Sequence, residues 1–153
     1  MKISKHFDAR ELVPPQIWKT YGIISRQFLR PELLRVLDLL RDKLGRPVVV
    51  NNWHTGGQYK ESGYRTPYTK TGAKYSQHKL GTAADVKVPE YTKDEVTYEA
   101  MTPMQVLAVI LANADEFRAA GMTTYENPNA TPTWLHIDCR WREPNNAFVM
   151  VNP

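Results

Sequence analysis

The sequence predicts an α+β fold in which an antiparallel sheet carries the functional residues and helices back it. Two stretches, 31–44 and 102–121, repeat apolar residues at helical spacing. Two others, 83–88 and 133–140, alternate apolar and polar residues. A strand that alternates in this way buries one face and leaves the other polar, as in an antiparallel sheet covered by helices on one side. No internal repeat or linker interrupts the chain, so we expect residues 1–153 to form one domain.

The N-terminal region predicts two short helices. Asp8 and Glu11 have the spacing of a capping box, but Pro14 and Pro15 end that helix quickly. Pro15 then opens a second short helix that runs to Tyr21, and Gly22 is placed to end it. We expect these segments to pack across the back of the domain.

The clearest predicted helix covers residues 31–44. It begins with Pro31, carries a stripe of leucines and ends before Gly45. The β-branched run 47–50 predicts a strand after it. The long loop 51–75 has no sustained period, and ordered loops of this length often belong to functional sites.

The stretch 83–88 predicts a strand with two different faces. Ala84, Val86 and Val88 share one face, and Asp85 and Lys87 share the other. The carboxylate of Asp85 is therefore expected to point away from the core.

The second long helix is predicted to begin at Thr102, where Pro103 and Gln105 complete a capping signal, and to end near Gly121. The stretches 122–126 and 133–140, separated by turn residues, predict an antiparallel hairpin. Residues 147–151 are expected to add a terminal strand.

Alternation along 133–140 again separates two faces. The apolar face carries Leu135, Ile137 and Cys139, and the other carries Trp134, His136, Asp138 and Arg140. The two predicted strands thus each present a possible metal ligand on a polar face.

Composition restricts the function classes. The formal net charge of +4 favours polyanions in general, but no nucleic-acid motif accompanies it, so nucleic acid is not an expected partner. No apolar stretch is long enough to cross a bilayer, and no secretory signal is recognisable, which predicts synthesis in the cytoplasm. The lone Cys139 excludes a cysteine-rich zinc module, so a metal would have to bind histidine and carboxylate.

Such a set is present in His78, Asp85 and His136. Two imidazoles and one carboxylate form an open zinc site whose fourth position is left for water. A histidine and an aspartate seven positions apart are nevertheless common by chance, and the bare spacing favours a structural or surface role.

The surrounding residues resemble a known family. The motifs are Ser76-x-His78-x-x-Gly81-x-Ala83-x-Asp85 and Trp134-x-His136-x-Asp138. They are similar to those of the zinc peptidases that cleave bacterial cell-wall peptides, which share their fold with the hedgehog signalling domain. The family includes D-alanyl-D-alanine carboxypeptidases, D,D-dipeptidases and phage endolysins that cut between L-alanine and D-glutamate. The resemblance is closest to small single-domain members of phage type.

This resemblance implies that His78, Asp85 and His136 bind Zn²⁺ and that the substrate is a peptidoglycan stem peptide. It implies hydrolysis of an amide bond by metal-activated water, of D,D-carboxypeptidase or L-Ala-D-Glu endopeptidase type. The alternative is a non-catalytic binding or structural module that keeps zinc for stability. We expect a monomer that acts on the wall after release from the cell or from a virion.

The general base has two candidates. Several relatives carry an acidic residue three positions before the second histidine, where this chain has Thr133. Glu126, at the end of the preceding strand, is the first candidate, although an exposed turn carboxylate would explain it equally well. Asp138 is the second candidate, or it orients a metal ligand instead.

Four further residues are candidates for substrate binding. Arg65 resembles the family's Gly-Tyr-Arg segment, in which the arginine holds a substrate carboxylate or polarises the scissile carbonyl. Ser76 is expected to orient His78 or the substrate, although a turn hydroxyl explains it nearly as well. His54 and Trp134 are placed to line the cleft, but a solvated loop histidine and a core or rim aromatic are the more frequent roles.

Overall fold

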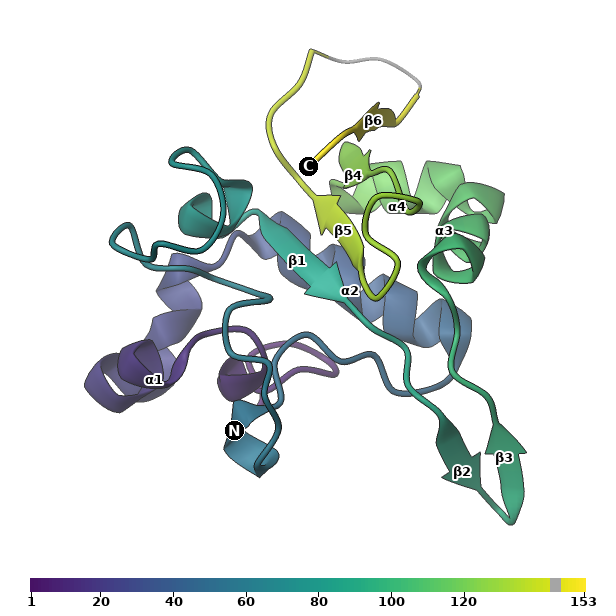
Figure 1. Ribbon diagram of the computed structural model, residues 1–153, viewed down its shortest axis with the longest axis horizontal. Coiled ribbons are helices and arrows are strands. Elements are labelled where there is room, and N and C mark those ends of the chain that lie inside the picture. Colours follow the sequence, from purple (N-terminus) through teal and green to yellow (C-terminus); the bar gives the residue numbers. More distant parts are fainter. Residues whose placement is uncertain (144–146) are drawn as a thin grey trace.

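The computed structural model describes residues 1–143 and 147–153, and it has the predicted α+β architecture (Figure 1). Four strands form one sheet in the order β1-β5-β4-β6. Their bounds are Ala83–Val86 (β1), Thr124–Glu126 (β4), Leu135–Asp138 (β5) and Val149–Val151 (β6). The pair β4–β5 is antiparallel, as predicted, and β1 also pairs with β5 in antiparallel fashion. Strand β6 lies parallel to β4, so the sheet is mixed at that edge.

Helices cover one face of this sheet. The longest, α2 (Pro31–Leu44), passes behind β1 in the view of Figure 1. The other helices are α1 (Pro15–Tyr21), α3 (Pro103–Ala112) and α4 (Ala114–Ala120). Aliphatic side chains of α2 and α3 form one buried cluster with those of β1 and β5, among them Leu37, Ile110, Val86 and Ile137. This cluster is the core against which the sheet is held.

The capping signals in the sequence are confirmed. Both halves of the Asp8 and Glu11 capping box are present, although the helix that follows is a single 3-10 turn, Ala9–Glu11. The Thr102 and Gln105 capping box opens α3. Further 3-10 turns cover Gly22–Phe28, Trp53–Thr55 and Gln77–Leu80.

Two element predictions are wrong. The helix expected over 102–121 is broken at Asn113, which leaves the helical conformation (φ −122°, ψ 32°) and turns its side-chain amide back to the carbonyl of Val109. Such a local bond offers the backbone an alternative to the helical ladder. The strand expected over 47–50 is reduced, within the described residues, to a bridge between Val49 and Lys87.

One hairpin was not predicted from the sequence. The strands β2 (Tyr91–Lys93) and β3 (Val96–Tyr98) form a separate two-stranded ribbon that projects from the body of the molecule (Figure 1). Its turn residues Asp94 and Glu95 both have positive φ. The usual sequence signal for such a turn is Asn-Gly or Asp-Gly, so the pair Asp94-Glu95 does not predict a turn.

Within the described part of the chain, we find no helix with both the length and the apolar character that spanning a membrane requires.

The register of β1 and β5 positions the polar residues. Asp85 lies directly opposite His136, and Ala84 lies opposite Ile137. Because side chains alternate along a strand, the aliphatic pair faces the helices and the polar pair faces the other way.

Candidate metal centre

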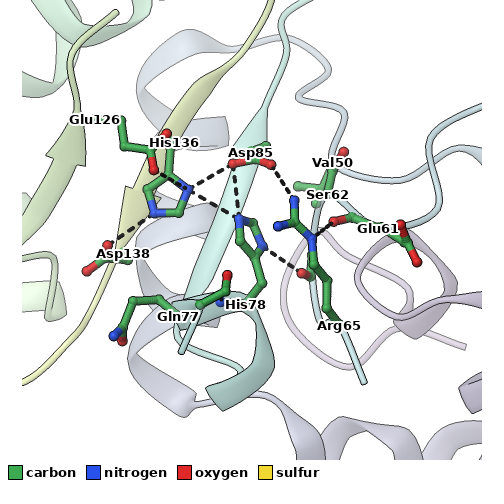
Figure 2. A network of polar contacts seen from close by, with 12 residues as sticks. Val50, Glu61, Ser62, Arg65, Gln77, His78, Asp85, Glu126, His136 and Asp138 are labelled. Carbon is green, nitrogen blue, oxygen red and sulfur yellow. Dashed lines mark hydrogen bonds and ion pairs between the residues drawn. The ribbon is translucent and has the colours of Figure 1, made fainter. Parts of the chain in front are cut away.

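The three predicted metal ligands meet at one point. Asp85 and His136 come from the paired strands β1 and β5, and His78 comes from the 3-10 turn just before β1 (Figure 2). The ligand atoms of all three lie within 4.8 Å of one another. Their side chains are buried, with residue exposures of 2% for His78, 7% for Asp85 and 4% for His136.

The turn before β1 directs His78 towards the strands. The Ser76 hydroxyl accepts a hydrogen bond from the backbone amide of His78 and caps the turn. Gly81 ends it in the left-handed region, with φ of 68°. A Cβ at Gly81 would lie 1.9 Å from the carbonyl oxygen of Phe28, so no other residue fits there without a shift of the backbone.

Hydrogen bonds on the outer side of each imidazole define which nitrogen is free. His78 Nδ1 lies 2.8 Å from the carbonyl oxygen of Gly63, which can only accept, so Nδ1 donates and the lone pair of the neutral ring is on Nε2. His136 Nε2 lies 3.1 Å from a carboxylate oxygen of Asp138, which leaves the lone pair on Nδ1. Two nitrogen lone pairs and a carboxylate oxygen therefore converge, and such a set of donor atoms can bind a cation.

The separations fit zinc. His78 Nε2 lies 3.2 Å from both Asp85 Oδ1 and His136 Nδ1, and the last two atoms are 2.9 Å apart. Bonds of about 2.0–2.1 Å at tetrahedral angles would separate the ligand atoms by about 3.3 Å. The three side chains thus approximate one face of a zinc tetrahedron.

The electrostatics of the cluster favour binding of a cation. Burial raises the pKa of Asp85, but its close contacts with the His136 and His78 rings outweigh this and hold the pKa well below its ordinary value. Burial lowers the pKa of His136, but hydrogen bonds to Asp138 and Asp85 raise it to about 9. A metal ion that binds here therefore replaces a proton on His136.

Asp85 and His136 are held by neighbouring residues on the side that is remote from the point where the three candidate ligands meet. Arg65 Nη2 donates to Asp85 Oδ2 at 3.1 Å, while its Nε donates to the carbonyl oxygen of Glu61. Arg140 Nε donates to Asp138 Oδ1 at 2.8 Å and so fixes the carboxylate behind His136. Contacts of this kind orient metal ligands and set the histidine tautomer.

The cluster opens into a cavity of about 450 Å³. Glu126, at the end of β4, lines it, and one of its carboxylate oxygens lies 3.9 Å from His136 Nδ1 (Figure 2). Arg65, Ser76 and Trp134 line the same cavity. A carboxylate, a guanidinium and an aromatic ring are thus gathered around the three candidate ligands.

The structure separates the remaining candidates. Asp138 is fully buried behind the His136 ring, on the side opposite the other two ligands. His54 lies in the turn Trp53–Thr55 with its ring edge-on to Trp53, and it is not brought to the cavity among the described residues. Cys139 packs against the core, and burial raises the pKa of its thiol far above the ordinary value.

Two partners of the site were not assigned a role from the sequence. Arg140 shares a strand face with Asp138, so alternation could have indicated their contact. The Gly63 carbonyl that orients His78 is a backbone group in a loop, and the sequence carries no signal for its position.

Lys87 lies near the site as well, because it follows Asp85 on the same face of the strand. Burial lowers the pKa of Lys87 to about 8, against the opposing effect of Asp85.

Comparison with known proteins supports the zinc assignment. A family model described as Peptidase M15 matches residues 5–109, more than half of the chain, and the matched part includes His78 and Asp85. The comparisons with curated proteins and with solved structures gave no significant match. Peptidases of the M15 family depend on zinc, and the donors found here suit that metal. This chain belongs to the peptidase M15 family.

Proposed function

We propose that this metallopeptidase hydrolyses an amide bond in peptidoglycan stem peptides, as a D,D-carboxypeptidase or an L-Ala-D-Glu endopeptidase. The observation that carries the proposal is the convergence of His78, Asp85 and His136 beside Glu126 in one cavity. The motifs around His78 and His136 are similar to those of cell-wall peptidases, and the net positive charge suits an anionic wall polymer.

In this proposal His78, Asp85 and His136 hold the zinc. When bound, zinc polarises the scissile carbonyl and lowers the pKa of water. Asp138 has the place of an orienting residue, because its carboxylate holds His136 Nε2 and lies away from the cavity.

Glu126 takes the role of general base. Its side chain is 18% exposed and lies beside His136 on the cavity side, so it can accept a proton from the attacking water. Water adds its oxygen to the carbonyl carbon, the carbon–nitrogen bond breaks, and Glu126 returns the proton to the leaving amine. Arg65 is placed to orient the substrate, since Nη1 has no hydrogen-bond partner among the described residues while Nε and Nη2 are fixed.

Hydrolysis of purified peptidoglycan tests the proposal. The zinc-loaded protein is expected to release peptide fragments, to stop after chelation and to recover when zinc is restored. The masses of the fragments would identify the bond that is cut. If folded, zinc-loaded protein released nothing from several wall chemotypes, the enzyme would be ruled out in favour of a non-catalytic zinc module.

A further inference from the structure

A second hollow of about 310 Å³ adjoins the candidate metal centre. It shares Arg65, Thr71, Asp85 and Trp134 with the first cavity, so the two hollows meet at these residues. The second hollow extends away from Glu126, towards Tyr59 and Lys87. A peptide bound at the metal centre can therefore continue into it.

Lys87 is held rigidly at this end of the cleft. Its backbone forms a bridge with Val49 through two hydrogen bonds of 2.8 and 2.9 Å. Its ammonium group donates to Ser62 Oγ at 2.9 Å, to the backbone oxygen of Asp85 at 3.1 Å and, over a longer 3.4 Å, to that of Val50. It also lies 4.2 Å from the centre of the Tyr59 ring. These contacts keep the charge at the wall of the hollow.

The ammonium of Lys87 has no direct ion pair with a carboxylate among the described residues. The oxygens that accept hydrogen bonds from it are neutral. The hollow has two carboxylates in its wall: Asp85 pairs with Arg65, and Glu61 accepts a hydrogen bond from Thr71 at 2.7 Å. Lys60 adds a further positive charge to the same hollow.

A partly buried ammonium whose accepting oxygens are neutral loses hydration, and the Asp85 carboxylate, which pairs with Arg65, offsets only part of that loss. An anion that enters the hollow supplies a counter-charge, whereas a neutral hydroxyl or amide does not. Carboxylates are the anions that peptides carry.

We propose that Lys87 binds a carboxylate of the substrate on the Tyr59 side of the scissile bond. The inference rests on the proposed function and narrows its substrate class to peptides with a free carboxylate at that position. Lys87 then acts as a binding residue that selects substrates, distinct from Arg65, whose guanidinium is tied to Asp85 beside the metal centre.

The test compares a stem pentapeptide with derivatives in which each carboxylate in turn is converted to the primary amide. At pH 7 the zinc-loaded wild-type protein is expected to prefer the acid at one position by about tenfold or more in kcat/KM, which corresponds to one hydrogen bond to a charged group. In Lys87→Gln this ratio falls towards one, and in Lys87→Arg much of it returns. Lys93→Gln on the exposed β2–β3 ribbon is the matched control and keeps the wild-type ratio.

Two results would overturn the inference. One is a wild-type protein that does not discriminate between any acid and its amide, which needs no variant to establish. The other is a Lys87→Gln protein that loses the same factor on acid and amide, because this is the effect of a purely structural lysine.

Calorimetric binding of the same peptides separates this inference from the proposed function. If no peptide is hydrolysed, the proposed function fails, and binding alone decides on the subsite. An acid preference in binding that disappears in Lys87→Gln supports the subsite, and equal binding of acid and amide rejects it.

Discussion

The β1–β5 pair buries apolar side chains on one face and polar side chains on the other. Towards the helices the pair presents Ala84, Val86, Leu135 and Ile137, none more than 1% exposed. On the other face it presents Asp85 and His136, which line the cavity, and Asp138 behind the His136 ring; all three are also buried. The first face is held by packing alone, and the second is held by hydrogen bonds that each require a particular partner.

Because the two faces are held in different ways, substitutions on them are expected to change different properties of the protein. On the apolar face, shape and volume matter, so a smaller side chain lowers the free energy of unfolding. On the polar face, the position of single atoms matters, so a substitution changes zinc binding or the chemistry. The predictions below test that separation, beginning with the largest effect on hydrolysis.

Replacement of a metal ligand is expected to have the largest effect. His136→Ala removes one of three ligands and leaves Asp85 without its shortest contact in the cluster. We expect loss of stoichiometric zinc and a fall in kcat/KM of roughly a thousandfold or more, since zinc supplies several kcal/mol of charge stabilisation. Zinc content and hydrolysis of stem peptides measure the two effects.

His6→Ala is the matched control, because His6 pairs with Asp42 on the surface. It should bind zinc and hydrolyse peptides like the wild type. Full activity of His136→Ala would mean that the polar face does not hold the catalytic metal.

Replacement of Glu126 is expected to separate chemistry from metal binding. Glu126→Gln keeps the size of the side chain but cannot accept the proton, so kcat should fall by about 10²–10⁴-fold while zinc content stays at the wild-type level. Glu116→Gln, which alters an exposed carboxylate paired with Lys43, should change neither quantity. A zinc-loaded Glu126→Gln protein that turned over at the wild-type rate would move the base elsewhere.

Sequence patterns were sufficient for those parts of the molecule in which local signals and tertiary structure agree. The helix 31–44 has a proline start, a leucine stripe and a glycine stop, and α2 has these bounds. The strands β1 and β5 and the division of their side chains between two faces follow from alternation. The break at Asn113 and the β2–β3 ribbon could not be predicted in the same way, because a side-chain bond to Val109 and an unusual Asp-Glu turn decide them.

The candidate site was likewise only partly predictable from the sequence. Its three candidate ligands could be named because the motifs around them resemble those of a known peptidase family, although the bare spacing alone favoured a structural or surface role. Their orientation depends on the Gly63 carbonyl and on the contact of Arg140 with Asp138, which become visible only when the loop and the strand are folded.

Replacement of Asp138 tests the orienting contact. Asp138→Asn keeps the shape but weakens the hold on His136 and on Arg140, so zinc affinity should fall by about 10–100-fold. Because hydrolysis requires zinc, activity should return at high zinc concentration, which a competition titration with a chelator would reveal. Asp115→Asn, an exposed aspartate that also pairs with a nearby arginine, should leave zinc affinity unchanged.

Replacement of Ile137 is expected to have the smallest effect on hydrolysis and a large effect on stability. Ile137 is fully buried on the apolar face, between His136 and Asp138 in the chain, so it shares their strand but lies on the opposite face. Ile137→Ala removes buried methyl groups and leaves a void, which should lower the free energy of unfolding by about 2–5 kcal/mol. Chemical denaturation of the zinc-loaded protein measures this loss, with Leu111→Ala on the exposed side of α3 as the control.

Below its unfolding transition, the Ile137→Ala protein should keep its zinc and hydrolyse peptides within about threefold of the wild-type rate, because additivity holds for groups that share no partners. A large loss of zinc affinity at unchanged secondary structure would show that the apolar face also sets the ligand positions. The strand backbone would then transmit packing to the metal centre, and the two faces would form one cooperative unit.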